Sequence, residues 1–421
     1  MPNSERSSLR ERQYPKKGKI VSKTILILGG SRYVVPVIEV AQEMGHRVVT
    51  CDYLPDNYAH SLSNEYRYAS IVNKDEVLHV AREVKADGIM SFAADPGVVT
   101  AAYVAEQLNL PFQGSLEAVK IMQNKNSFRA MLSENGFNSP LAFSFNNISS
   151  VMKKADAFPY PVIVKPTDSA GSKGVSRVDA AKDLHRAAET AFAFSASKTC
   201  IIEEYIEKAG CSSDSDGFTI DGRFECLSFT DQLFDECSGN PYAPMAYSMP
   251  STMPESAQVE LTHDLQRLAS LLGLRSGIYN IETRIGIDGE PYIMEMSPRG
   301  GGNRLAEMLR MSSQVDLISA SVSAALDIRI EHVAMPQYDG FWYQQMLYSR
   351  KNGTFVGIEI DPMIDPLCVR ETQLWIKPGD KVHAFESANY AIGSAFFRFD
   401  TKAELEAFTK KSQPPITVTV A

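Results

Sequence analysis

Two glutamates flanking a short turn have the spacing that most directly indicates chemistry. They lie in the segment YNIETRIGIDGEPYIMEMSPRGGGN, residues 279–303, on either side of Asp288-Gly289. Asp-Gly between alternating segments is typical of a two-residue hairpin turn, which places Glu282 opposite Glu295. Two carboxylates about 5 Å apart repel each other, and a divalent cation reverses the sign of that interaction. Hard oxygen ligands suit magnesium, so the spacing predicts a magnesium site.

The same register extends the polar face of this hairpin. It places Asn280 opposite Ser297, and Arg299 follows two residues later. An arginine there could stabilise a phosphoryl group in a transition state. The alternative is a solvated surface hairpin, which fits poorly because the other face is apolar, with Tyr279, Ile281 and Ile285.

A lysine followed by small residues is a second candidate for anion binding. Lys165 ends the strand-like segment PVIVK, and the loop TDSAGSKG, residues 167–174, follows Pro166. Small residues let backbone N–H groups approach phosphate oxygens, and a lysine at the strand end can reach the same anion. An ordinary glycine-rich hairpin with a solvated lysine explains the pattern as well. The Walker A pattern G-x-x-x-x-G-K-[ST] does not occur.

The segment CIIEEYI, residues 200–206, reads as a strand with two acids at its exit. Such a strand can offer backbone groups and a carboxylate to the edge of an adenine ring. A half-buried strand with solvated acids is the alternative, and it is preferred when this segment is considered alone.

The first strand, TILIL, ends in Gly29-Gly30, and Asp52 ends the second strand. This arrangement superficially matches a dinucleotide-binding fold. However, G-x-G-x-x-G is missing, because bulky residues of GGSRYV stand where a pyrophosphate needs close backbone approach. We therefore expect a strand-to-helix turn beside a substrate pocket instead, and a nicotinamide oxidoreductase is a distant alternative.

The elements that must position these residues change character along the chain. Up to about residue 120, strands alternate with helices, which predicts a parallel, doubly wound α/β domain. A helix is then expected from Asn124 as N-cap to Gly136. Hairpins follow, with a turn at Asp221-Gly222 and a helix over 256–272. Short strands and a helix near 402–410 predict a small third α+β domain.

Composition limits the class of protein. The 421 residues are 44% hydrophobic and 22% charged, as in an ordinary globular protein. Apolar runs long enough for a bilayer are missing, and so is a secretory signal. The six cysteines lack C-x-x-C spacing, which favours a reduced, cytoplasmic compartment over a disulfide frame or zinc site.

Charge is unevenly distributed. The net charge is −9, although residues 1–23 carry seven basic and two acidic side chains. The remainder is therefore strongly acidic, which argues against nucleic-acid binding. We expect residues 1–23 to form a solvated, disordered tail.

In combination, these motifs resemble the ATP-grasp superfamily of carboxylate–amine ligases. The ordered series is Lys125 at a helix start, Lys165, the loop 169–174, E-E-Y-I at 203–206, and the acid pair ending in E-M-S-P-R at 295–299. The amino-acid ligases, biotin carboxylase and the large-chain unit of carbamoyl phosphate synthase are similar. The resemblance implies an ATP-grasp fold with an N-terminal α/β domain (24–120), an ATP-binding domain (121–330) and a small C-terminal α+β domain (331–421).

The resemblance also implies roles for particular residues and ATP with Mg²⁺ as cofactors. Arg299 is the implied catalytic residue, and Glu282, Glu295 and Ser297 are the implied metal ligands. Substrate contacts are implied for Arg284, Gly301, Gly302 and Asn303. The implied ATP-binding residues are Lys125, Lys165, Ser169, Gly171, Ser172, Gly174, Glu203, Glu204, Tyr205 and Ile206, with the Glu203 carboxylate accepting from the adenine amino group.

Two positions depart from the family pattern. Ser297 stands where asparagine is usual, so the third metal ligand is a weaker hydroxyl or a water. A glutamate that often binds the ribose is replaced by Ser212 or a neighbour. The acid pair and Arg299 remain, and we expect an active enzyme.

The resulting functional hypothesis is a soluble ligase that activates a carboxylate as an acyl phosphate, forms ADP and joins the acid to an amine. Its partners are then small-molecule acids and amines, with neither nucleic acid nor membrane, and a homodimer is a candidate assembly. Alternatives are bicarbonate or formate activation by the same fold, and a non-catalytic ATP-binding regulatory subunit.

Overall fold

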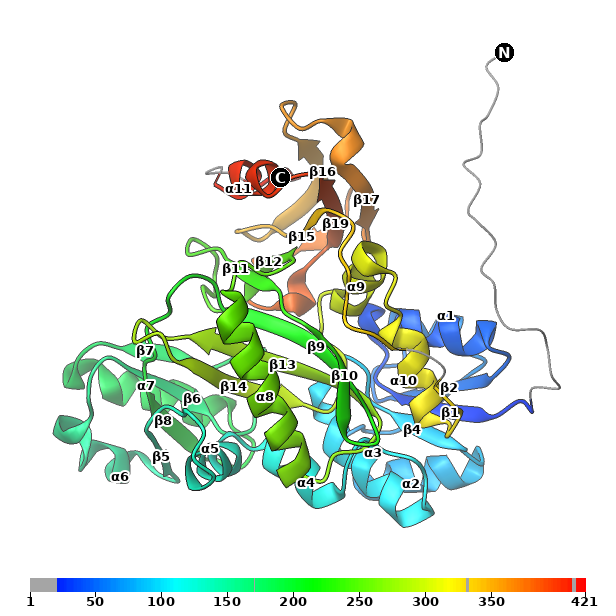
Figure 1. Cartoon of the computed structure of the whole chain (residues 1–421), viewed down its shortest axis with the longest axis horizontal. Coiled ribbons are helices and arrows are strands. Elements are labelled where there is room, and N and C mark those ends of the chain that lie inside the picture. The colour runs from blue at the N-terminus through cyan, green and yellow to red at the C-terminus, as the bar shows by residue number, and fades with distance from the viewer. Residues whose placement is uncertain (1–20, 170, 331–332, 411–413) are drawn as a thin grey trace.

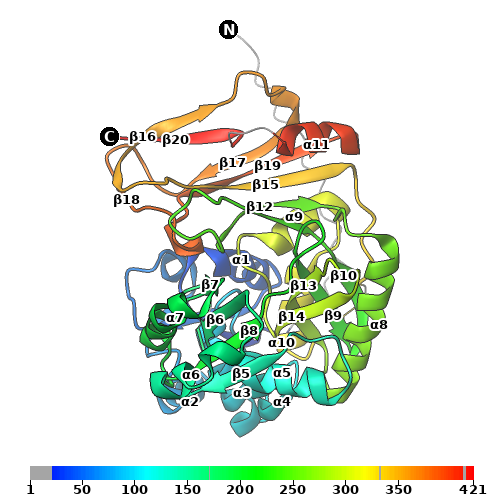
Figure 2. The same cartoon turned by 90° about the vertical axis from the view of Figure 1, so that its left-hand side faces the viewer.

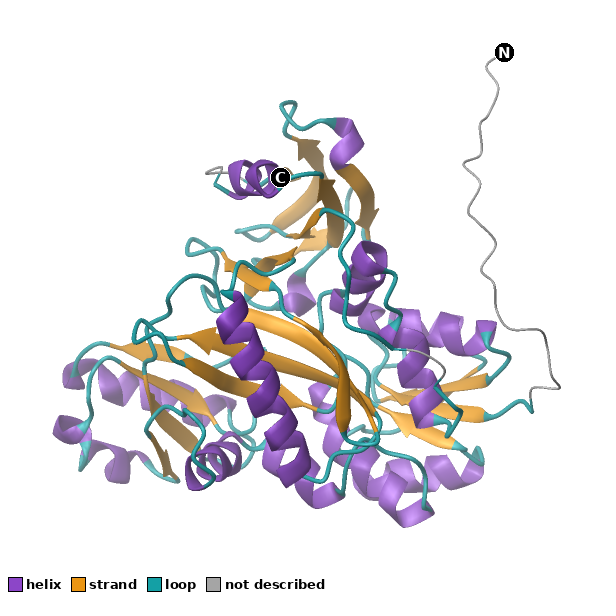
Figure 3. Cartoon of the chain, in the orientation of Figure 1, coloured by secondary structure: helices purple, strands orange, loops and turns teal. Residues whose placement is uncertain are grey.

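The computed structural model describes residues 21–169, 171–330, 333–410 and 414–421. Most of the expected basic tail (1–23) and Ala170 of the glycine-rich loop lie outside these residues. Helices flank the strands in most of the chain, and the C-terminal strands lie together at the top of the view (Figures 1 and 3).

The N-terminal part is a parallel sheet with strand order β3-β2-β1-β4. Alternate residues of the central strand serve two different cores: Leu26 and Leu28 pack with α2 and α3, whereas Ile25 and Ile27 pack with α1 and α10. The predicted doubly wound α/β texture is confirmed. The elements are β1 (Thr24–Leu28), α1 (Val35–Glu43), β2 (Arg47–Asp52), β3 (Glu65–Tyr68), α2 (Lys74–Glu83), β4 (Gly88–Met90), α3 (Asp95–Leu108), α4 (Leu116–Gln123) and α10 (Leu317–Ala325).

A second sheet, antiparallel and of order β5-β8-β6-β7, carries the two lysine and glutamate motifs. Val162 and Val164 of β6 pack under α6 and α7 with Cys200 and Ile202 of β8. Since side chains alternate across a strand, Lys165 and Glu203 lie together on the opposite face. The elements are α5 (Lys125–Glu134), β5 (Ala142–Phe145), α6 (Ile148–Met152), β6 (Val162–Pro166), β7 (Ser176–Val178), α7 (Ala181–Phe194) and β8 (Cys200–Glu204).

The third sheet, of order β10-β9-β13-β14, contains the glutamate hairpin. Tyr279 and Ile281 are fully buried beneath α8, which lies across one face of the sheet (Figure 1). A solvated surface hairpin is therefore excluded. The predicted turn at Asp221-Gly222 is confirmed, because Ile220 pairs with Arg223. The elements are β9 (Ser213–Ile220), β10 (Arg223–Ser228), α8 (Glu255–Leu271), β13 (Gly277–Ile285), β14 (Pro291–Ser297) and α9 (Leu305–Ser313).

The two-residue turn predicted at Asp288-Gly289 is wrong, although the pairing inferred from it is right. The Gly286 N–H donates to the Glu290 carbonyl at 2.9 Å, so three residues, 287–289, form the loop. This shifts the register next to the turn by one residue. A bulge at Met294 shifts it back, and Glu282 does pair with Glu295. The two deviations from the expected register cancel at the acid pair.

The remaining strands form two sheets, of orders β11-β12-β15-β19-β17 and β18-β16-β20. The first of these joins a hairpin from residues 231–249 to C-terminal strands, and Figure 2 shows both above the rest of the chain. The elements are β11 (Asp231–Phe234), β12 (Pro244–Met249), β15 (Phe341–Leu347), β16 (Gly353–Ile360), β17 (Val369–Leu374), β18 (Lys381–Val382), β19 (Gly393–Phe399), α11 (Lys402–Thr409) and β20 (Ile416–Val420). Among the described residues, the helices are too short or too polar to cross a membrane.

Candidate active site

The N-terminus of α5 places the first candidate lysine. Asn124 is the N-cap, as predicted, and its side chain accepts from the Ser127 N–H at 3.1 Å. Lys125 Nζ donates to the Ser169 carbonyl at 3.0 Å and lies 3.6 Å from the Glu295 carboxylate. Lys125 thus joins the glycine-rich loop to the glutamate hairpin.

Arg129, one helical turn after Lys125, belongs to a buried ionic triad that sequence reasoning missed. Its Nε lies 3.0 Å from the Glu203 carboxylate, which also lies 2.6 Å from Lys165 Nζ. Burial by itself would raise the pKa of Glu203, but Arg129 and Lys165 outweigh burial and lower it to about 2. Burial lowers the pKa of Lys165. The triad therefore contains two cations for one carboxylate.

Glu203 is buried between Arg129 and Lys165, and this affects its expected contact with adenine. Its carboxylate is shared by two protein cations, so its acceptance from an adenine amino group stays a prediction. Along the same segment, the Glu204 N–H donates to the Leu141 carbonyl at 2.8 Å, and the Ile206 carbonyl accepts from Arg284 at 3.0 Å. The Tyr205 N–H donates to Pro161.

The glycine-rich loop is attached to the hairpin of residues 231–249. Ser172 has a positive φ of 56° and its hydroxyl donates to the Tyr242 carbonyl at 3.0 Å. Asn240 donates to the Ser172 carbonyl at 3.3 Å and to the Glu386 carbonyl at 3.0 Å. Gly171 and Gly174 also have positive φ values. The loop thus lies between the second sheet and the C-terminal part.

Glu282 and Glu295 face each other across β13 and β14, as predicted. Burial raises the pKa of Glu282 well above its usual range, and the charges of Glu295 and Asp214 raise it further. In the described ranges, groups of three or more His, Cys, Asp or Glu suited to a metal ion are not found. The pair therefore offers two carboxylates, which is the number that a Mg²⁺ ion shared with substrate phosphates commonly takes from a protein.

Two further buried acids, Asp214 and Asp216, lie on β9 beside this pair. In the β9–β13 register, Asp214 pairs with Glu282 and Asp216 with Asn280. Burial raises the pKa of both, to about 6 for Asp216. Asp214 accepts from Asn280 at 2.5 Å and from the Tyr247 hydroxyl at 3.2 Å. Sequence reasoning missed these acids, because only the segment from Gly217 onward was considered as a strand.

Arg299 makes a bidentate ion pair with Asp95 at the N-terminus of α3. Both nitrogen–oxygen distances are 2.7 Å, and the side chains are 12% and 19% exposed. Arg299 Nη1 also donates to the Asn280 oxygen at 2.9 Å and to the Gly300 carbonyl at 2.8 Å. Burial would raise the pKa of Asp95, but Arg299 outweighs burial and lowers it. The guanidinium is thus fixed before any substrate binds.

Ser297 takes part in this network. Its hydroxyl donates to Asp95 at 3.0 Å and accepts from Gln123 Nε2 at 2.6 Å. Those contacts direct the hydroxyl towards the Asp95–Arg299 pair, so its expected role as a weak metal ligand stays a prediction.

The residues expected to contact substrate divide into two groups. Arg284 lies just beyond the end of β8, where it donates to the Ile206 carbonyl. Gly301 and Asn303 lie with the β9 acids: the Gly301 N–H donates to Asp216 at 2.7 Å, and Asn303 Nδ2 donates to Tyr247 at 3.0 Å. A Cβ at Gly302 would meet nothing within 4 Å, so this residue borders open space.

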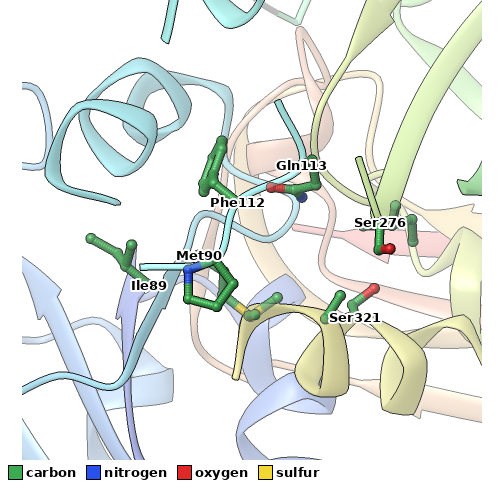
Figure 4. A pocket seen from close by; sticks show the side chains of 11 residues that line it. Ile89, Met90, Phe112, Gln113, Ser276 and Ser321 are labelled. Carbon is green, nitrogen blue, oxygen red and sulfur yellow. The ribbon is translucent and has the colours of Figure 1, made fainter. Parts of the chain in front are cut away.

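A separate small cavity lies where β4, α10 and Gln113 meet (Figure 4). Its volume is about 10 Å³, roughly enough for one water molecule. Gln113 Nε2 donates to the Pro298 carbonyl at 3.2 Å beside it. The cavity is too small for a substrate and marks the contact between the N-terminal sheet and the glutamate hairpin.

Asp95 could have been found from the sequence. It follows the strand GIMSF, and the carboxyl ends of parallel strands are where ligand-binding residues gather. Arg129 carried a weaker signal, its i, i+4 spacing from Lys125. Gln123 and Tyr247 carried none.

Comparisons with known proteins agree with this geometry. The family model of the ATP-grasp domain matches residues 158–307. The carbamoyl phosphate synthase large chain of Thermotoga neapolitana is 23% identical over 61% of this chain and 23% of its own length. Carnosine synthase 1 of Gallus gallus is 26% identical over 73% of this chain and 36% of its own. The crystal structure of the L-amino acid ligase from Bacillus licheniformis superposes with a TM-score of 0.76 at 20% identity, over 95% of this chain and 99% of that one.

The chain therefore contains an ATP-grasp domain and has the ATP-grasp fold, which confirms the predicted resemblance. It spans about a quarter of the length of the first curated relatives it matches.

The buried triad generates a prediction about stability. Glu203→Gln leaves Lys165 and Arg129 without their counter-charge in a buried position, and we expect it to destabilise the protein by about 3–5 kcal/mol. Glu204→Gln is the matched control, because Glu204 is exposed, and its expected cost is below about 1 kcal/mol. Urea unfolding measures both. Equal losses of unfolding free energy in the two variants would show that the triad stabilises the protein no more than an exposed acid does.

The buried acids with raised pKa values, Glu282, Asp214 and Asp216, generate a prediction about how stability depends on pH. Carboxyl groups with raised pKa values hold protons in the folded state that the unfolded chain has released, so stability falls as pH rises. Burial lowers the pKa of His46 and His60, which opposes this trend below about pH 6.5. Between about pH 6.5 and 8.5, we therefore expect metal-free protein to lose stability, and Glu282→Gln to lose less. Unfolding free energies that rise across this pH window would contradict the assignment of raised pKa values to these carboxyl groups.

Proposed function

We propose that this chain is an ATP-dependent ligase that forms an acyl phosphate and ADP from a carboxylate, and then joins the acyl group to an amine. One observation carries the proposal: Lys125 contacts both the glycine-rich loop and Glu295 of the acid pair. A polyphosphate bound near Lys125 would thus meet cations on one side and metal-binding carboxylates on the other.

The lysines and the loop form the proposed ATP site. Lys165 and Arg129 exceed the single charge of Glu203, and a phosphate anion would balance that excess. Backbone groups of residues 204–206 would bind adenine through the Glu204 carbonyl and the Ile206 N–H, since the Glu204 N–H and the Ile206 carbonyl have protein partners. Ser169 and the glycine-rich loop would cover the phosphates.

The acid pair fits magnesium. Two like charges held together in a partly buried place are unfavourable without a cation, which agrees with the raised pKa of Glu282. Glu282 and Glu295 would hold the ion, and ATP oxygens and water would complete its coordination. A bound Mg²⁺ ion supplies neutralisation of phosphate charge. ATP-grasp enzymes use ATP and Mg²⁺.

Arg299 is positioned to stabilise the phosphoryl group. Asp95, Asn280 and the Gly300 carbonyl fix its guanidinium, so little reorganisation is required when charge develops nearby. Asp95 is then a positioning residue, and the N-terminal domain acts on the chemistry through it.

The names of the similar proteins include enzymes that join an acid to an amine and enzymes of other chemistry. Carnosine synthase and an L-amino acid ligase are among them. Carbamoyl phosphate synthase is another, so bicarbonate activation is the alternative that experiment must separate.

The products of turnover test the proposal. With Mg–ATP and a panel of amino acids and other carboxylates, paired with amines, we expect ADP and inorganic phosphate in equal amounts, together with an amide product. Release of AMP and pyrophosphate would mean adenylation. Bicarbonate-dependent ADP release without an organic acid would favour the alternative.

The metal ligands are tested by ligand-induced stabilisation. Mg–ATP should raise the melting temperature of the wild-type protein by mass action. Glu282→Gln and Glu295→Gln should each lose most of this gain and most turnover, whereas the exposed Glu290→Gln should keep both. If the two former variants keep the full thermal shift and normal turnover, the metal lies elsewhere.

A further inference from the structure

Three buried side-chain oxygens around Gly301–Asn303 have no hydrogen-bond donor among the described residues. They are Asp216 Oδ2, Asn303 Oδ1 and Gln344 Oε1. Their residues are 1%, 4% and 0% exposed, so bulk water does not reach them. They come from β9, from the segment before α9 and from β15 of the C-terminal sheet. Buried acceptors are nearly always paired in folded proteins, so three around one short segment require an explanation.

All three residues are attached to the same segment. The Gly301 N–H donates to Asp216 Oδ1 at 2.7 Å, and Gln344 Nε2 donates to the Asn303 carbonyl. The remaining oxygen, Oδ1 of Asn303, belongs to a residue of this segment. The unpartnered oxygens thus belong to one connected group, here called the acceptor cluster (Asp216, Asn303 and Gln344).

The hydrogen-bond partners of Asn303 and Gln344 indicate which atom of each side-chain amide remains without a partner. The Tyr247 hydroxyl donates to Asp214 and its oxygen accepts from Asn303, so the Asn303 nitrogen faces Tyr247. Gln344 turns its nitrogen towards a main-chain carbonyl, which can only accept. Exchanging nitrogen and oxygen in either amide would break these bonds. In this arrangement the atoms left over are acceptors.

A ligand that donates hydrogen bonds would satisfy these acceptors. A primary ammonium group has three N–H donors and a positive charge that suits Asp216. A hydroxyl group has one donor and a carboxylate has none. The open space beside Gly302 offers room for the rest of an amine.

The acceptor cluster also lies beside the proposed reaction centre. Asn280 pairs with Asp216 across β9 and β13, and its side-chain oxygen accepts from Arg299 Nη1 at 2.9 Å. One residue therefore separates the acceptor cluster from the arginine that we assign to the phosphoryl group. An amine bound there, after its ammonium group has given a proton to the Asp216 carboxylate, is near the acyl group that it would attack.

We propose that the acceptor cluster binds the primary amine substrate through its ammonium group, with Asp216 as the counter-charge. Its assignment to a substrate rests on the proposed ligase function, whereas its affinity for ammonium groups does not. Gln344 lies on the C-terminal sheet, so the choice of amine would depend on that part of the chain.

The experiment compares two cations of equal charge without ATP. Methylammonium has three N–H donors, and tetramethylammonium has none. At about 100 mM chloride salt, we expect methylammonium to raise the melting temperature of the wild-type protein by about 2 °C over tetramethylammonium. Asp216→Asn should abolish this difference. Asp183→Asn, an exposed acid on α7, should keep it.

A second variant keeps the proposal testable if Asp216→Asn does not fold. Gln344→Met keeps side-chain volume and removes one acceptor together with the donor to the Asn303 carbonyl, and we expect it to reduce the difference by at least about half. Equal melting temperatures in the two salts would show that the acceptors are only hydrated, and would overturn the proposal. An unchanged difference in Asp216→Asn would also overturn it. Because the measurement contains no ATP, a chain that discriminates the salts but forms no ADP would contradict the ligase function alone.

Discussion

The structure depends on holding charged side chains out of water around one edge of the glutamate hairpin. A buried charge is tolerated only with a partner, because desolvation is costly. Glu203 has two partners within the chain, Lys165 and Arg129. Glu282 has the opposite surroundings, with Glu295 and Asp214 on either side. The central claim of the proposed mechanism is that a polyphosphate bound together with a divalent cation would relieve both the cationic excess at the triad and the anionic excess at the acid pair.

Parts that are distant in the sequence maintain this arrangement. Asp95 of the N-terminal domain fixes Arg299, α10 returns to cover the N-terminal sheet, and Gln344 reaches the Gly301–Asn303 segment from the C-terminal sheet. A change in the placement of any of these parts would therefore affect Arg299 or the Gly301–Asn303 segment through one or two hydrogen bonds. The substrate groups are expected where these parts meet, and Asp95 and Gln344 are positioned to influence them from opposite sides.

The sequence predicted what local patterns determine. Alternation in the first 120 residues indicated the parallel sheet, and Asn124 indicated the start of α5. The acid pair was predicted because side chains alternate along strands, although its register came from a two-residue turn that is wrong. The three-residue loop and the bulge at Met294 could not be read locally, since the bulge carbonyl is held by Arg129 from another element. Partners such as Asp95 for Arg299 depend on tertiary packing, so the roles of Glu203 and Ser297 were inferred without knowing their neighbours.

Proton release on binding of Mg–ATP tests the central claim most directly. If Glu282 is protonated in the metal-free protein because its pKa is raised, it must lose that proton when it binds a cation. Calorimetric titration at about pH 7 in buffers of different ionisation enthalpy counts the protons. The account predicts net release of up to one proton by the wild-type protein and a clearly smaller release by Glu282→Gln. Binding of Mg–ATP to the wild-type protein with no proton release, or an equal release by the variant, would contradict it.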